Sequence, residues 1–389
     1  MPEPTLELAD IFRQYGPAYR QAHSLPLHQH RLMQAIEICR TPLLGGAVEW
    51  CDHCQFTHIR YRSCRNRHCP KCQGAAREHW LEDRRAELLP TDYFHVVFTL
   101  PEQIASLAFF NKEVVYGILF HATAETLLTT AAQRLGVELG FFCVLHSWGQ
   151  NLHFHPHLHC VVPGGGLSPD HKRWTAARRR RFLLPVKVLS RLFRRLVLEA
   201  LRKANAAGDL LFFGDLAPLL DLGAFTQFLA PLAHKDWVVY AKPPFGGPVH
   251  VLEYLGRYTH RVAISNQRLL ALQDGQVSFS WTDYRDSLRK VMTVPAEEFI
   301  RLFLQHALPP GFQRIRYYGF LANCHRADKL ALCRNLLAAP YSDLLPSPTD
   351  YPNPCARLRL CPKCGIGTMR QLQVLFPCYG PVPLLVDTS

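Results

Sequence analysis

The sequence predicts an α+β fold built on an antiparallel sheet that is flanked by helices. Short strand-like runs alternate with helical runs, and only a tight turn separates the strand-like segments Phe141–Trp148 and Phe154–Val162. Strands joined in this way run antiparallel, whereas the regular winding of a parallel sheet needs a helical crossover. With 389 residues, 48% of them apolar and 19% charged, the chain is long and apolar enough for about two or three domains.

The individual elements follow from apolar spacing in chain order. Residues 1–45 are expected to be mostly helical, with a break or a kink at Pro17 because proline removes a backbone donor. Residues 46–75 are rich in cysteine and are predicted to be irregular. Helices are predicted over 76–89, 103–135 (two helices), 186–205, 249–260 and 296–306, and strands over 93–100, 141–148, 154–162, 237–241 and 277–281.

The charge balance points to a polyanionic partner. Lys and Arg number 44 against 31 Asp and Glu, which gives a net charge of +13 and favours nucleic acid, with a merely soluble basic protein as the alternative. The N-terminus lacks the pattern of a signal peptide, and no run of 18 apolar residues predicts a membrane span. A reducing cytoplasmic location follows as the expectation, and there paired cysteines indicate metal rather than disulfides.

Two Cys-x-x-Cys pairs near the N-terminus predict a structural zinc ion. Each pair can supply two thiolates to a tetrahedral site, and four thiolates leave no open position for catalysis. His53, Cys64 and His68 lie close enough in sequence to replace one of the four. The predicted ligands of this single site are Cys51, Cys54, Cys69 and Cys72.

A third such pair, Cys361 and Cys364, lies near the C-terminus and is half of a possible second zinc site. Cys355 and Cys378 are the residues that could complete it. Arginines gather in two stretches that can follow a phosphate backbone, although either stretch can also be an ordinary solvated surface. They are Arg60, Arg62, Arg65 and Arg67 in the cysteine-rich stretch, and the run Arg178, Arg179, Arg180 and Arg181.

Histidines alternate along the strand predicted at 154–162. Alternate residues of a strand point to the same face and lie about 6.6 Å apart, so His157 and His159 can approach one cation. Neutral imidazoles suit a divalent metal that keeps open positions. His146 on the preceding strand can complete the site across the hairpin, with Gln150 and His153 as alternatives.

Two tyrosines, Tyr254 and Tyr258, are four residues apart in a predicted helix and therefore share one face. A tyrosine hydroxyl can attack a phosphodiester and keep the DNA covalently attached. Arg257 and Arg261 add positive charge where a phosphate would lie. The other interpretation is an aromatic stripe in the core, against which Gly256 argues because glycine disfavours a plain packing helix.

These motifs together resemble the HUH endonuclease superfamily, which is named after a His-hydrophobic-His motif. The resemblance is closest to the rolling-circle insertion-sequence transposases of the IS-ninety-one type and covers roughly residues 10–370. A serine at position 147, where the family usually has threonine, touches no proposed role. The segments that carry the resemblance are Ser63–Cys72, His146–Gly149, His155–His159, Tyr254–Arg261 with the following Val262–Asn266, and Arg314–Asn323.

The resemblance implies a HUH/Rep-like palm, in which Mg²⁺ or Mn²⁺ is held by the histidine pair and a third ligand. It implies that one tyrosine attacks single-stranded DNA, giving a 5′-phosphotyrosine and a free 3′-OH, and that the other serves a second cleavage or the target DNA. A zinc-ribbon-like N-terminal domain would help to recognise hairpin element ends. The expected division is a helical and zinc-binding domain at 1–90, a nuclease domain at 91–325 with a helical insertion near 178–235, and a C-terminal region at 326–389.

Other functions remain open at this point. A replication initiator or a relaxase would use the same histidine and tyrosine chemistry, although the sequence contains no helicase P-loop. A non-catalytic zinc-ribbon regulator would bind duplex DNA without cutting it. A zinc hydrolase is a weaker alternative because no His-Glu-x-x-His helix is present.

Overall fold

The computed structural model describes residues 6–85, 87–177, 183–242, 256, 262–283, 285–338 and 359–378. Contacts divide the chain into two compact units, each made of separate stretches of sequence. We call residues 77–261 and 308–344 the sheet unit, and residues 1–76, 262–307 and 345–389 the cysteine unit. The three-part division predicted from the sequence stays a prediction.

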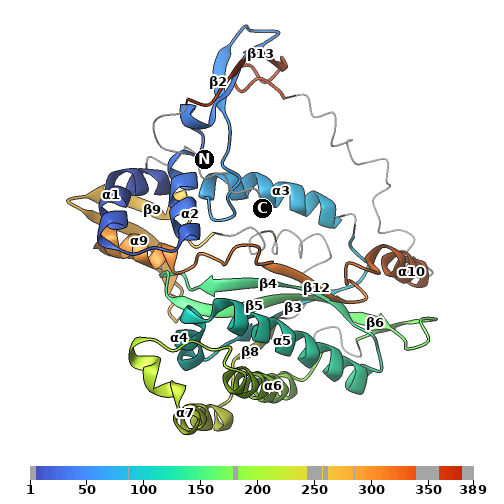
Figure 1. Ribbon diagram of the computed structural model, residues 1–389. Helices are drawn as coiled ribbons and strands as arrows, with labels where there is room; N and C mark the ends of the chain where they lie inside the picture. The colour runs from blue at the N-terminus through green and yellow to red at the C-terminus, as the bar shows by residue number, and fades with distance from the viewer. Residues whose placement is uncertain are drawn as a thin grey trace. The chain divides into compact units, whose positions relative to one another are not determined.

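The sheet unit is organised around a five-stranded sheet in which every neighbouring pair is antiparallel (Figure 1). This confirms the predicted α+β class. The strand order is β12-β4-β5-β3-β8, so β5 with its histidines lies at the centre. The bounds are β3 Tyr93–Thr99, β4 Gly140–Trp148, β5 Phe154–Pro163, β8 Val239–Lys242 and β12 Ile315–Gly319.

Side-chain alternation gives this sheet two different faces. One face packs under the helices and forms the main core, in which the Phe193 ring from α6 meets Phe98 of β3 at 5.0 Å between ring centroids. The other face carries a smaller apolar cluster around Phe142 and Val144, against which Trp80 packs. The helices over the first face are α4 Glu102–Phe110, α5 Lys112–Leu135, α6 Val186–Ala206 and α7 Leu222–His234 (Figure 1).

The rest of the sheet unit is peripheral. Helix α10 packs through Leu330 and Cys333 into a third cluster with Phe320. Its remaining elements are β6 Gly165–Leu167, β7 Trp174–Ala176, η2 Gly214–Leu220, α10 Arg326–Ala338 and the C-terminal part of α3 Pro70–Arg85. No single helix in the described ranges is long and apolar enough to cross a membrane; the bent pair of η2 and α7 passes by combined length and composition only.

The cysteine unit combines a helical part with two small antiparallel sheets. Of the break or kink predicted at Pro17, the break is wrong, because α1 continues through the proline and buries Phe12 before and Tyr19 after it. One sheet has the order β13-β1-β2 and the other β11-β10-β9. Its elements are α1 Leu8–Ala22, α2 Leu27–Glu37, η1 Pro42–Leu44, β1 Gly46–Cys51, β2 Thr57–Tyr61, η3 Asn266–Arg268, β9 Leu269–Gln273, β10 Gln276–Asp283, β11 Leu288–Pro295, α9 Ala296–Leu304 and β13 Met369–Leu375.

The stretch 46–75 was predicted to be irregular, and this is wrong for part of it. Strands β1 and β2 form a hairpin in which Gly46 pairs with Tyr61 and Trp50 with Thr57. Strand β1 is short, and its buried and half-buried side chains alternate only from Val48 to Cys51, which gives a weak strand pattern in the sequence.

Candidate metal centres

Three histidines converge on the face of the main sheet opposite to helices α4 to α7, and His146 and His159 are buried there. His146 on β4 is the direct cross-strand partner of His157 on β5, and His159 lies two residues further along β5. Cross-strand partners and alternate residues share a face, so the antiparallel register alone brings the three rings together. Their potential ligand atoms all lie within 4.8 Å of one another, and His157 Nε2 is 3.1 Å from His159 Nε2.

Each histidine of the pair on β5 has its Nδ1 engaged and its Nε2 directed to the common centre. His157 Nδ1 is 2.7 Å from the carbonyl oxygen of His155, which can only accept. His159 Nδ1 is 2.8 Å from His95 Nε2. When both Nδ1 atoms carry the proton, both Nε2 lone pairs are available to a metal, which is the usual second-shell arrangement of metal-ligating histidines.

His95 is a functional candidate that the sequence analysis missed. It lies on β3, is 4% exposed, and stacks on the His159 ring at 5.0 Å between centroids. Burial, and secondarily the positive charges of Lys242 and His157, lower the pKa of His95 to about 3, so its ring is neutral and can accept a hydrogen bond. The only signal in the sequence is a histidine inside an otherwise apolar strand, Tyr93–Thr99.

The third position of the group is filled by His146, the residue predicted across the hairpin. It is 2% exposed and stacks on Trp148 at 4.7 Å, which fixes the plane of its ring. The pairing of β4 with β5 shifts its register between His146 and Trp148. The alternative ligand His153 is exposed in the turn and does not join the group.

The four cysteines predicted to bind one zinc ion do not meet at one site. Cys69 and Cys72 lie with Cys39 and Cys64, whereas Cys51 lies with Cys54 and with the C-terminal pair Cys361 and Cys364. The prediction of a single site is therefore wrong in its grouping, although each of the four residues belongs to one of two tetrathiol clusters. The error has a physical reason: hairpin β1–β2 directs Cys51 and Cys54 away from the start of α3, which supplies the other pair.

We call Cys39, Cys64, Cys69 and Cys72 the helical cluster. Cys39 follows α2, and the pair Cys69 and Cys72 comes from the start of α3. Cys72 Sγ is 3.6 Å from the Sγ atoms of Cys39 and Cys64. Four sulfurs arranged tetrahedrally on zinc, with Zn–S bonds of about 2.3 Å, lie about 3.8 Å apart, so the cluster fits a zinc ion.

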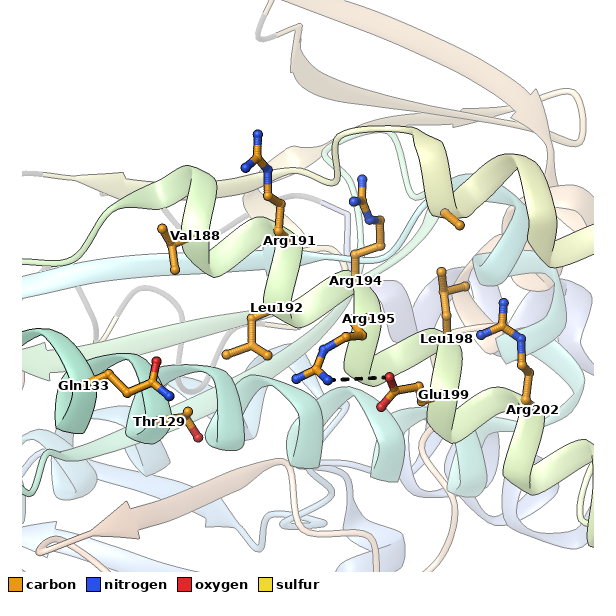
Figure 2. Close-up of a pocket in the computed structure, with 11 residues that line it drawn as sticks. Thr129, Gln133, Val188, Arg191, Leu192, Arg194, Arg195, Leu198, Glu199 and Arg202 are labelled. Carbon is orange, nitrogen blue, oxygen red and sulfur yellow. Dashed lines mark ion pairs between the residues drawn. The ribbon is translucent and has the colours of Figure 1, made fainter.

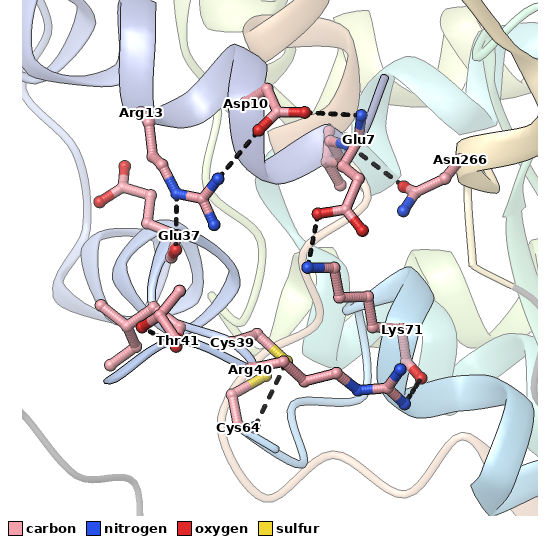
Figure 3. A network of polar contacts seen from close by, with 12 residues as sticks. Glu7, Asp10, Arg13, Glu37, Cys39, Arg40, Thr41, Cys64, Lys71 and Asn266 are labelled. Atoms are coloured by element: carbon pink, nitrogen blue, oxygen red, sulfur yellow. Dashed lines mark hydrogen bonds and ion pairs between the residues drawn. The ribbon is translucent and has the colours of Figure 1, made fainter. Parts of the chain in front are cut away.

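A polar network holds the helical cluster against α1 and α2 (Figure 3). Lys71, between the two cysteines of α3, pairs with Glu7 at 2.5 Å, and its carbonyl oxygen accepts from Arg40 at 3.0 Å. Asn266 accepts from the backbone N–H of Leu8 at 3.2 Å. Cys64 is one of the predicted replacement ligands, whereas Cys39, a single cysteine just after α2, has no sequence motif that would predict its role.

Several predicted site residues lie outside the described residues. These are both tyrosines, Tyr254 and Tyr258, with the neighbouring Arg257 and Arg261, and the run Arg178, Arg179, Arg180 and Arg181. Gly256 is described: it is helical and buried, and a Cβ added there would come within 2.7 Å of a Leu81 methyl group. Gly256 therefore makes a close approach to α3 that a larger residue would disturb.

The arginines of the cysteine-rich stretch have different environments. Arg60 pairs at 2.6 Å with the buried carboxylate of Glu49, so it has a structural partner. Arg62 and Arg65 are exposed, and Arg67 is half-buried. Arg60 is exposed as well, so three of these four arginines present charge to solvent, Arg60 with an ion pair to Glu49.

A separate hollow of about 710 Å³ lies between α5 and α6 (Figure 2). Figure 2 shows the arginine side chains that extend from α6 along it; Arg195 pairs with Glu199 at 3.7 Å and Arg194 donates to the carbonyl oxygen of Lys235 at 2.5 Å. Helices α5 and α6 cover the face of the sheet opposite to the histidines. This hollow is therefore not part of the histidine centre.

Two family models match this chain. A model described as "Putative transposase" matches residues 140–329, and one described as "Transposase zinc-binding domain" matches residues 11–100. The chain is 58% identical to "Putative transposase y4qJ" of Sinorhizobium fredii, covering 98% of each chain. It is 28% identical to "Transposase for insertion sequence element IS801" of Pseudomonas savastanoi pv. phaseolicola, over 84% of this chain and 79% of that one. No solved structure matches it significantly.

Proposed function

The chain belongs to the IS-ninety-one type family of transposases, and from this premise we propose that it nicks and rejoins single-stranded DNA at the ends of its element through tyrosine transesterification. The observation that supports this most strongly is the convergence of His146, His157 and His159 on one face of the central sheet, with the Nε2 atoms of His157 and His159 3.1 Å apart. A covalent tyrosine link conserves the phosphodiester bond energy for the later joining step.

His146, His157 and His159 would hold a divalent ion, and their donor chemistry fits one. Three neutral imidazoles leave the full charge of the ion uncompensated, which favours binding of a phosphate. When bound, the ion supplies Lewis-acid polarisation of the scissile phosphate. Imidazole nitrogen suits Mn²⁺ better than Mg²⁺, which prefers oxygen ligands, so we expect Mn²⁺ to be bound more tightly here.

Tyr254 or Tyr258 would supply the nucleophile. The phenolic oxygen forms a bond to phosphorus, and the bond from phosphorus to the 3′ oxygen breaks. The products are a 5′-phosphotyrosine on one DNA end and a free 3′-OH on the other. The phenolic proton leaves the tyrosine, and a proton is taken up by the departing 3′ oxygen. The second tyrosine would accept the second strand end or the target DNA. In each joining step a free 3′-OH attacks the phosphotyrosine, re-forms a phosphodiester and releases the tyrosine.

The cysteine unit would bind the hairpin ends of the element. Zinc in the helical cluster would be structural, because four thiolates fill its coordination sphere. The exposed Arg62 and Arg65 are the described arginines best placed to contact phosphates. The proposal includes that the protein acts on DNA at the nucleoid, in the bacterial cytoplasm.

A nicking assay on labelled single-stranded element-end DNA tests the proposal. With Mn²⁺ or Mg²⁺, wild type should form a protein–DNA adduct that survives a denaturing gel, and the variant with both Tyr254→Phe and Tyr258→Phe should form none. Tyr240→Phe is the matched control, because Tyr240 is an exposed tyrosine of the same unit on β8. The single variants then assign the order of attack.

The alternatives separate in the same assay. Absence of an adduct with either metal, from zinc-loaded protein that still binds the DNA, would refute the proposal in favour of a non-catalytic regulator. A replication initiator or relaxase would share the adduct but would cut a replication or transfer origin rather than paired element ends. Both curated relatives described above are named as transposases, which favours paired ends.

A further inference from the structure

The second group of thiols brings together two segments that are far apart in the sequence. Cys51 and Cys54 follow β1, and Cys361 and Cys364 precede β13; Cys51 Sγ is 3.7 Å from Cys364 Sγ, and Cys54 Sγ is 3.7 Å from Cys361 Sγ. These separations exceed a disulfide bond of about 2.05 Å and agree with the roughly 3.8 Å expected for sulfurs around one zinc ion. The four atoms lie within 4.8 Å of one another.

The two halves of this group have the same backbone geometry. Gln55 N–H donates to the carbonyl of Cys51 at 3.0 Å, and Gly365 N–H donates to the carbonyl of Cys361 at 2.9 Å. Gln55 and Gly365 both take a left-handed conformation, with φ of 58° and 68°. Equivalent turns after each Cys-x-x-Cys pair present both thiols of that pair to one point.

Backbone N–H groups also donate to the sulfurs, which stabilises thiolates rather than thiols. Cys51 Sγ accepts from the N–H groups of His53 and Cys54 at 3.4 Å each. In the other half, Cys361 Sγ accepts from Lys363 and Cys364 Sγ from Gly367, each also at 3.4 Å. A Cβ added at Gly367 would press on Cys51 Sγ, so glycine is required where the two halves meet.

Apart from the thiols, strand β13 is held by its pairing with β1 and by polar contacts, which include the ion pair of Arg370 with Asp52 at 3.1 Å. It pairs with β1 from Gly46 opposite Leu375 to Cys51 opposite Met369, and Asp52 accepts from Thr368 N–H at 2.7 Å. Its apolar side chains are largely exposed, with Leu372 at 60%. A three-stranded sheet whose outer strands β2 and β13 are largely exposed is marginal by itself, and metal binding supplies folding free energy in such small domains.

We propose that Cys51, Cys54, Cys361 and Cys364 hold a second structural zinc ion, which clasps the C-terminal segment 359–378 onto hairpin β1–β2 as one split zinc ribbon. The ribbon is distinct from the helical cluster, shares no ligand with it, and does not depend on the proposed nuclease activity. Tetrathiolate coordination selects zinc over the oxygen-preferring cations.

Zinc content of the full-length protein gives the first test. The double variant Cys361→Ser with Cys364→Ser should lose one equivalent of zinc relative to wild type, while Cys378→Ser, an exposed cysteine outside the four, should lose none. Cys364→His should keep the ion, because imidazole is also a zinc ligand. Unchanged zinc content in the double variant would overturn the proposal.

The clasp itself is tested by cutting the chain. A protease site inserted within 339–358 allows the C-terminal fragment to be released after folding. With zinc bound, the fragment should stay with the rest of the protein on a sizing column, and a chelator should release it. Release without chelator, or retention in the zinc-free protein, would overturn the clasp even if the Ser variants fail to fold. Nicking activity is measured separately, so failure of either proposal is recognised by itself.

Discussion

The hydrogen bond between His95 Nε2 and His159 Nδ1, at 2.8 Å, makes His95→Leu an informative perturbation. Leucine fills the buried position with an apolar side chain but removes the acceptor that fixes the His159 tautomer. Loss of a hydrogen bond in a buried site costs about 1–3 kcal/mol, and loss of a second-shell partner typically weakens metal binding about 10–100-fold. We expect Mn²⁺ affinity to fall within that range.

His95→Gln is the matched variant, because a glutamine amide oxygen can occupy the place of the accepting nitrogen. It should restore most of the Mn²⁺ affinity that His95→Leu loses. His121→Leu serves as the control for removing a histidine as such, since His121 is exposed on α5 and pairs with Glu125. Tautomer control, rather than mere burial, is what separates the glutamine variant from the leucine variant.

The assay is a Mn²⁺ titration by electron paramagnetic resonance on protein whose thiol sites are loaded with zinc. In nicking reactions the Mn²⁺ concentration at half-maximal rate should rise for His95→Leu, while the rate at saturating Mn²⁺ should largely recover. Unfolding of the metal-free variants by urea reports any general damage. Wild-type affinity in His95→Leu, or equal losses in the leucine and glutamine variants, would refute the reasoning.

Three further perturbations have defined outcomes. Gly319→Ala should lower the urea-unfolding free energy by about 3 kcal/mol or more, because φ is +58° and the backbone leaves no room for a Cβ; Gly136→Ala, at φ +66° in open space, should cost only about 1 kcal/mol. Gly256→Ala should reduce nicking with Mn²⁺ binding unchanged, and adding Leu81→Ala should restore it; no rescue would refute the packing argument. Burial lowers the pKa of Lys112 from 10.5 to about 8, so the unfolded chain binds more protons between these values and stability should rise with pH across that window. Urea unfolding of Lys112→Met should lack that rise.

The sequence reveals the histidine centre well because its signal is local. Alternation along one strand places His157 and His159 on one face, and a short turn places His146 opposite them. His95 escapes because it comes from β3, and its partner His159 is 64 residues away. A single histidine within an apolar strand gives no indication of the residue it will meet.

The cysteine clusters show the opposite case. Spacing correctly indicates tetrathiol metal sites, but it cannot tell which pairs combine when ligands of the same kind are separated by more than 300 residues. The strand β13 that brings the distant pair back is short and exposed, so it lacks the alternation that predicts a strand. The continuation of α1 through Pro17 likewise depends on packing of both halves of the helix against the unit.

The split ribbon also orders events during translation. Half of its ligands leave the ribosome near the beginning of synthesis and half near the end, so the hairpin must wait for residues 361–364 while the histidine-bearing sheet is already complete. An interrupted or truncated gene copy would therefore yield a chain with its histidines and tyrosines but without a closed ribbon. Closure of the ribbon thus requires synthesis past residue 364.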